Sequence, residues 1–123
     1  LPKLVDAGGR VGLGSHGELQ GLGAHWELWM MASGGLKPHD MLRAATLHGA
    51  EAIGLQRDLG SLETGKLADL LVLDRNPLVD ITNSASLRFV MKNGRMYDAN
   101  TLAEVWPRTR SLEAGWWTKV EPH

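Results

Sequence analysis

The chain has 123 residues, with 13 Lys and Arg against 14 Asp and Glu, a net charge of −1 and no Cys. This length suits one domain with a core, but it is about half of a (β/α)8 barrel, which needs roughly 250 residues. The balanced charge gives no indication of a nucleic-acid partner. The lack of Cys excludes disulfides and thiolate metal sites within this chain. The sequence contains no apolar run of about 18 residues, so no membrane span is predicted.

The first part of the chain predicts one short strand, a glycine-rich loop and two helices. Residues 10–14 predict a brief strand, which leads into a loop with several glycines. Residues 24–33 predict a helix, because large apolar side chains recur there at three- and four-residue spacing. Residues 38–53 predict a second helix, with Pro38 at its first position and Gly54 just past its end.

Residues 60–74 predict a strand, a turn and a second strand. The run 70–73, Leu-Leu-Val-Leu, is apolar without alternation, which is typical of a strand covered on both faces. Residues 63–66 form a polar turn in which Gly65 can take positive φ without a Cβ clash. The chain is therefore expected to reverse between Leu62 and the apolar strand.

The last part of the chain predicts a hairpin followed by weaker structure. Residues 87–92 alternate as a strand, Asn93-Gly94 is a strong two-residue hairpin turn, and residues 95–97 pair back. Residues 101–106 are expected to form one or two helical turns. We expect the last dozen residues to be loosely held, because termini order only when they are tied down.

The run Gly60-Ser-Leu-Glu-Thr-Gly-Lys-Leu-Ala-Asp-Leu-Leu-Val-Leu-Asp74, with Asn76-Pro77-Leu78 and Val90-Met91-Lys92-Asn93-Gly94-Arg95, resembles the C-terminal end of the metal-dependent amidohydrolase superfamily. The resemblance covers residues 11–97 and is to the branch that includes imidazolonepropionases and prolidases. It implies an α/β fold. Residues 1–57 would be the last strand and closing helices of a (β/α)8 barrel, residues 58–98 part of an accessory β-sandwich, and residues 99–123 a C-terminal extension. The motif itself is structural in this family, and Asp69 is expected to make a buried structural hydrogen bond in the sandwich.

His16 is the candidate catalytic and metal-binding residue. In the family this loop usually carries an Asp that binds one metal and accepts the proton of the attacking water. A neutral imidazole can bind zinc but brings no negative charge, so the Asp role is not carried over unchanged. The pattern Gly14-Ser-His16-Gly with Gly23-Ala-His25-Trp-Glu27 is similar to that of a subgroup attached to a Tol-type β-propeller. The alternative is a hydrogen-bonded loop histidine.

Glu18 and His25 are the candidate substrate-binding residues. For Glu18 the alternative is a solvated loop position, and for His25 it is a packing or capping role. His25 and Glu27 point to different faces of a helix, so they are a poor metal chelate. His48 is expected to be a group at the edge of the core with a hydrogen-bond partner.

The resemblance implies part of a metal-dependent hydrolase that cleaves carbon–nitrogen bonds with metal-activated water, in a cyclic amide or peptide-like small-molecule substrate. Zinc is the expected cofactor of the full-length parent, and this chain alone is not expected to hold it tightly, because the family's other ligands lie upstream of residue 10. The expected partners are the remainder of the barrel and, through apolar surface, another copy of the chain. The start at Leu1 rather than Met agrees with a piece of a longer protein. The alternative is a non-enzymatic interaction or pseudo-enzyme segment.

Overall fold

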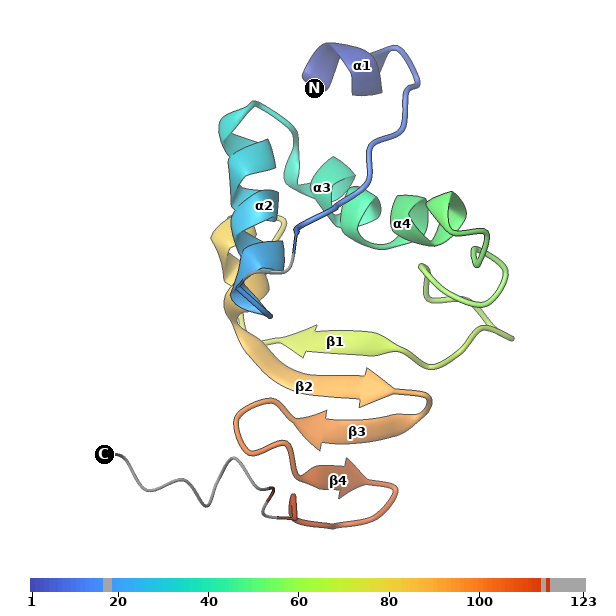
Figure 1. Ribbon diagram of the computed structural model, residues 1–123, viewed down its shortest axis with the longest axis vertical. Coiled ribbons are helices and arrows are strands. Elements are labelled where there is room, and N and C mark those ends of the chain that lie inside the picture. The colour runs from blue at the N-terminus through green and yellow to red at the C-terminus, as the bar shows by residue number, and fades with distance from the viewer. Residues whose placement is uncertain (17–18, 114, 116–123) are drawn as a thin grey trace.

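The computed structural model describes residues 1–16, 19–113 and 115, which form a helical layer beside a small antiparallel sheet (Figure 1). In chain order the elements are α1 (Pro2–Asp6), α2 (Leu22–Ser33), α3 (Pro38–Ala45), α4 (Leu47–Ala52), β1 (Leu70–Leu73), the 3-10 helix η1 (Ile81–Ala85), β2 (Leu87–Lys92), β3 (Arg95–Asp98) and β4 (Glu104–Trp106). None of the described helices is long and apolar enough to cross a membrane.

The helix predicted over residues 24–33 is confirmed as α2, which begins two residues earlier. The single helix predicted over residues 38–53 is wrong, because it is broken into α3 and α4 at Thr46. Thr46 has φ −123° and ψ −89°, outside the helical region, and its hydroxyl donates to the carbonyl of Leu42 at 2.7 Å. Such a bond to the preceding turn competes with regular helix geometry. Pro38 does stand at the start of α3, as predicted.

The strand predicted over residues 10–14 is absent, and this segment is extended chain without strand pairing. Its backbone is held by helices instead. The N–H of Leu13 donates to the carbonyl of Ala44 at 3.3 Å, and a ring nitrogen of His48 lies 3.1 Å from the carbonyl of Val11. A strand requires a neighbouring strand to pair with, and the described residues place none beside this segment. The prediction that His48 has a hydrogen-bond partner at the edge of the core is confirmed.

The four strands form one sheet in the order β1-β2-β3-β4, with antiparallel pairing throughout. The predicted hairpin is confirmed, since β2 and β3 pair from Phe89↔Asp98 to Lys92↔Arg95 and the turn residues Asn93 and Gly94 have φ of +48° and +75°. The described residues contain no second sheet, so the assignment of these strands to a β-sandwich stays a prediction.

Asp69 ties the start of β1 to this hairpin. Its Oδ1 accepts the N–H of Asn93 at 2.6 Å, and its Oδ2 pairs with the ammonium of Lys92. These contacts, that with Lys92 first, lower the pKa of Asp69. The structural hydrogen bond expected of Asp69 is therefore confirmed, but its expected burial is wrong, since the side chain is 23% exposed.

The turn at residues 63–66 is also confirmed, because Gly65 has φ +93° and Lys66 N–H donates to the carbonyl of Glu63 at 3.2 Å. The strand expected before this turn is wrong, since the chain is irregular there and Leu62 is 81% exposed. The expectation that β1 is covered on both faces is wrong as well for the described residues. Leu71 is 57% exposed, so the face of β1 on which it lies is not covered by the described residues.

The helical turn expected over residues 101–106 is wrong, because β4 lies there and pairs with β3. Asp98 explains the difference. Its Oδ1 accepts from the N–H groups of Asn100 and Thr101 and from the hydroxyl of Thr101, at 2.9 to 3.1 Å. A side chain that binds the following backbone in this way favours a turn over a helix. The expectation about the last dozen residues falls mostly on positions outside the described residues.

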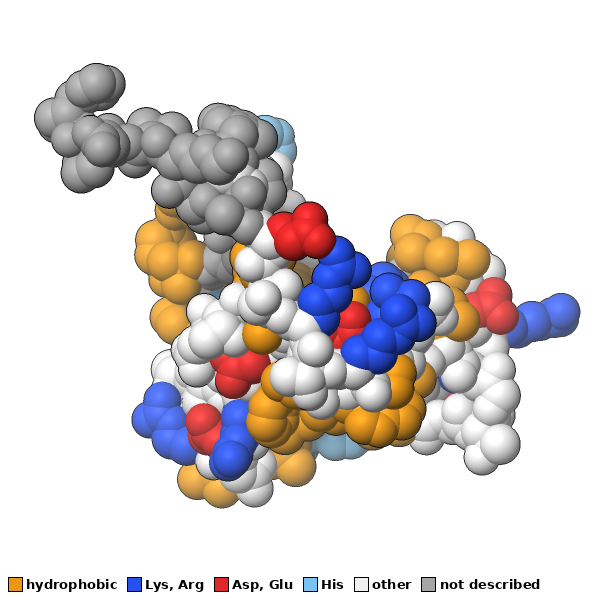
Figure 2. Space-filling model, turned by 90° about the horizontal axis from the view of Figure 1, so that it is seen from below, with side chains coloured by type: hydrophobic (Ala, Val, Ile, Leu, Met, Phe, Trp, Pro, Cys, Tyr) orange, Lys and Arg blue, Asp and Glu red, His pale blue; other side chains and the backbone are white. Residues whose placement is uncertain are grey.

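The core lies where α2, α3 and η1 meet. It contains Leu28, Met31, Leu36, Met41, Ala44 and Ile81, of which Met41 and Ala44 are fully buried. Other apolar side chains remain at the surface, and the face seen in Figure 2 carries them in several patches among charged groups. The core thus fixes η1 against α2, while much of the sheet edge stays open.

Candidate functional site

Two contacts anchor the segment that leads into the loop carrying His16. The guanidinium of Arg10 pairs with the carboxylate of Glu51 on α4 at 2.7 Å. Four residues later, the backbone N–H of Gly14 lies 3.2 Å from both carboxylate oxygens of Glu27 on α2. The segment therefore crosses from the α3–α4 pair to α2, as Figure 1 shows, and Ser15, the residue before His16, lies beside Gly23 in the first turn of α2.

His16 itself is exposed. Across residues 1–16, 19–113 and 115, no group of three or more His, Asp or Glu side chains lies close enough to hold a metal ion. A catalytic zinc typically takes three protein ligands. The described residues therefore do not make a zinc site by themselves, and His16 is at most one ligand of a larger set.

His25 lies in the first turns of α2 and is half-buried. Its Nδ1 is 3.0 Å from the hydroxyl oxygen of Ser84 on η1, and the indole N–H of Trp29 donates to the same oxygen at 3.1 Å. The rings of His25 and Trp29 are 6.3 Å apart and tilted by 33°. His25 is thus held by a defined polar contact, and it is not brought together with His16 by any metal-like cluster of described residues.

Ser84 is fixed from the other side by the cap of its own short helix. Asp80 precedes η1, and its Oδ1 accepts the hydroxyl of Thr82 at 2.7 Å and the N–H of Thr82 at 2.9 Å. These two bonds, the hydroxyl first, lower the pKa of Asp80. The carboxylate form thereby stabilises the start of η1 and, with it, the position of Ser84.

The sequence predicted His16 and His25 as site residues, and this stays a prediction, but it did not single out Ser84 or the anchoring role of Glu27. The separation of Glu27 from His25 on the helix was predicted correctly, since Glu27 binds Gly14 and His25 binds Ser84. Ser84 lies 59 residues from His25, and a lone serine in a polar stretch carries no sequence pattern. Glu18 lies outside the described residues.

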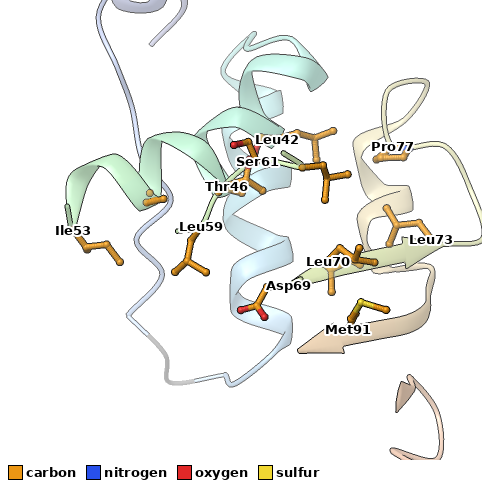
Figure 3. A pocket seen from close by; sticks show the side chains of 16 residues that line it. Leu42, Thr46, Ile53, Leu59, Ser61, Asp69, Leu70, Leu73, Pro77 and Met91 are labelled. Atoms are coloured by element: carbon orange, nitrogen blue, oxygen red, sulfur yellow. The ribbon is translucent and has the colours of Figure 1, made fainter. Parts of the chain in front are cut away.

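A separate apolar groove of about 740 Å³ lies between the α3–α4 pair and β1. Figure 3 shows its lining, with Leu42 and Ile53 on the helical side and Leu70, Leu73 and Met91 on the sheet side. Neither His16 nor His25 is among the described residues that line it. The groove is therefore distinct from the loop that carries His16 and from the surroundings of His25.

Comparison with known proteins gives one family and several relatives. A model of the amidohydrolase family matches residues 1–97. A 5-methylthioadenosine/S-adenosylhomocysteine deaminase of Teredinibacter turnerae is 36% identical over 86 residues, which is 61% of this chain and 20% of the relative. An imidazolonepropionase of Symbiobacterium thermophilum is 54% identical over 39 residues, 32% of this chain and 9% of the relative. Among solved structures, a putative prolidase from Bifidobacterium longum has a TM-score of 0.69 and 30% identity, covering 91% of this chain and 26% of that one.

Proposed function

The chain belongs to the amidohydrolase family, as the sequence resemblance predicted, and from this premise we propose that it is the C-terminal part of a hydrolase that cleaves carbon–nitrogen bonds. The observation that carries the proposal is the family match over residues 1–97. The chain spans only about a fifth of the first relative's length. The activity is therefore proposed for a longer protein, and the 123 residues alone are expected to be catalytically silent.

In the proposed arrangement, residues 1–57 are the last segment and closing helices of the barrel, residues 58–98 belong to an accessory β-sandwich, and residues 99–123 extend it. The amidohydrolase fold of the neighbouring structures supports an α/β protein. The open edge of β1 and the apolar groove beside it support the idea that further parts of the protein lie against this segment. Those further parts are the proposed remainder of the barrel.

His16 is the proposed catalytic residue, and it is also the proposed metal ligand of this segment. Its exposure and its place in the loop leading to α2 support contact with a substrate. A neutral imidazole has one free nitrogen lone pair, so His16 can either bind the metal or accept a proton from the attacking water, and the two roles are alternatives. The family uses a divalent metal such as zinc, and because the described residues do not assemble three ligands, the other ligands are proposed to come from outside them.

His25 and Glu18 are proposed to bind the substrate. The substrate is proposed to be a small molecule with a cyclic amide or peptide-like bond, a class supported by the names of the relatives, imidazolonepropionase and prolidase. Another relative is named a deaminase, so the carbon–nitrogen bond to an amino group is a further bond type to be tested. His25 is half-buried and lies on α2, the helix that follows the loop carrying His16. This position supports the assignment of His25 to substrate binding.

The second candidate is a non-enzymatic interaction segment. It is favoured by the apolar groove and by large hydrophobic side chains that stand exposed, such as Leu62 at 81% and Ile53 at 67%. Exposed apolar surface of this kind is typical of contact with another protein. The two candidates differ in what they require of the rest of the protein.

The test begins with the genomic sequence upstream of the codon for Leu1. A reading frame that encodes a His-x-His motif and continues into this chain supports the hydrolase, and its absence favours the interaction segment. The longer protein is then assayed for hydrolysis of acyl-amino acids, dipeptides with proline and cyclic amides. His16→Ala should abolish turnover, whereas the matched variant His39→Ala, at another exposed histidine, should leave it unchanged. Turnover that survives His16→Ala would refute the assignment of His16.

A further inference from the structure

Ser84 stands out among the polar groups because it is buried and contacts two ring nitrogens of α2. It is only 5% exposed. Among the described residues its hydroxyl oxygen has two partners, Nδ1 of His25 at 3.0 Å and Nε1 of Trp29 at 3.1 Å. His25 and Trp29 are four residues apart, so they share one face of the helix. Ser84 is thus too buried to contact a substrate itself, and it lies at the centre of a small polar cluster with His25 and Trp29.

The positions of the protons in this cluster follow from the donor inventory. An indole N–H is only a donor, so Trp29 occupies one lone pair of the Ser84 oxygen. If His25 also carried its proton on Nδ1, the Ser84 oxygen would accept twice, and its own O–H would have no acceptor among the described residues. A buried donor without a partner is costly. The satisfied arrangement has the Ser84 hydroxyl donating to an unprotonated Nδ1.

We propose that Ser84 is a positioning residue that keeps the proton of neutral His25 on Nε2, so that His25 offers an N–H donor to an oxygen atom of the substrate. The acceptor would be a carbonyl or carboxylate oxygen, the groups that amide and peptide-like substrates carry. The role of the tautomer in substrate binding rests on the proposed function, whereas the role of Ser84 in selecting it does not.

The surroundings of Ser84 suit a positioning role because they hold it rigidly. Asp80 caps the start of η1 through Thr82, and Ile81, three residues before Ser84, is 6% exposed in the core with Leu28 of α2. The serine and the histidine therefore belong to two elements that pack on each other. A site residue whose supporting contacts are fixed in this way keeps its geometry without a cost at the moment of binding.

The experiment is a long-range proton–nitrogen correlation spectrum of the histidine rings in the 123-residue chain, at a pH well above the ordinary histidine pKa of about 6.5. His25 should carry its proton on Nε2 to a greater extent than the exposed His39, which serves as the internal reference. In Ser84→Ala the His25 ring should approach the tautomer balance of His39. A His25 ring protonated on Nδ1, or one that Ser84→Ala leaves unchanged, would overturn the proposal.

Two further variants separate positioning from packing. Trp29→Phe removes the indole donor but keeps the Ser84 hydroxyl, so His25 should keep its tautomer. If Trp29→Phe disturbs the ring as much as Ser84→Ala does, packing alone explains the effect and the proposal fails. Ser33→Ala is the matched control for loss of a serine hydroxyl, since among the described residues Ser33 bonds only its own helix, at the carbonyl of Met30, and this variant should leave the His25 tautomer unchanged.

In the longer hydrolase, Ser84→Ala should raise KM by about twofold at most, because the fraction of His25 protonated on Nε2 would fall only to that of an unconstrained ring, and it should leave kcat unchanged. A fall in kcat with unchanged KM would contradict a role in substrate binding. The spectra and the kinetics test different claims, so a negative result in one does not decide the other. A protein without hydrolase activity would refute the proposed function, while the spectra alone would still decide whether Ser84 sets the tautomer.

Discussion

Gly60 and Gly65 offer a matched test of how the glycine-rich motif packs against the helices. Both have almost the same backbone, with φ of +92° and +93°. A Cβ on Gly60 would lie 2.7 Å from the Cβ of Ala50, 3.0 Å from the Cα of Leu47 and 3.1 Å from the carbonyl oxygen of Thr46. A Cβ on Gly65 would meet nothing within 4 Å. The two sites therefore differ in space and not in φ.

Gly65→Ala should cost only the positive-φ penalty, about 1–2 kcal/mol of the free energy of unfolding. Gly60→Ala adds an overpacking cost of about 1–3 kcal/mol, because two of its close neighbours are backbone atoms that yield little. The reduced freedom of the unfolded chain offsets both variants equally. With a urea m-value of about 1–3 kcal/mol/M, the midpoint of Gly60→Ala should lie lower than that of Gly65→Ala by roughly 1 M.

The assay is urea denaturation followed by far-ultraviolet circular dichroism, with equal protein concentrations for all variants. A double-mutant cycle with Ala50→Gly then isolates the contact between the two Cβ atoms. The cycle should give a coupling energy of about 0.5–3 kcal/mol that partly relieves Gly60→Ala. Equal midpoints for the two single variants would refute the close approach of Gly60 to α4.

Three further predictions concern the sheet. Gly94→Val should lower the unfolding midpoint, because a β-branched residue is strained at φ +75° by roughly 1 kcal/mol or more, and an unchanged midpoint would count against the hairpin. Folding lowers the pKa of Asp69 and Asp98 from 3.8. Their stabilising effect is therefore present above that value and lost as the pH falls through the lowered pKa, so the urea midpoint should stay level from pH ~6 to pH ~4 and drop below pH ~4, less steeply in Asp98→Asn. The chain should self-associate in light scattering, and Leu71→Lys should reduce this, because a charge on an edge strand opposes pairing; a sharp monomer that binds no apolar dye would contradict it.

The sequence by itself determined the elements whose cause is local. The Asn93-Gly94 turn needs positive φ at two adjacent residues, and few sequences supply it. Pro38 favours the first turn of α3 because its ring fixes φ. The apolar run of β1 predicts a strand regardless of which elements pack against it. The family resemblance, carried by the motif that leads into β1, was likewise readable from the sequence and is confirmed.

The tertiary structure decided the features that depend on partners far away in the chain. Residues 10–14 resemble a strand but are held by the helices, since pairing requires a neighbour that the described residues do not place there. Asp98 turns the chain so that residues 104–106 reach β3, where a helix was expected. Ser84 meets His25 across 59 residues. Local propensity is a property of a few neighbouring residues, whereas strand pairing and buried hydrogen bonds exist only once the fold has brought both partners together.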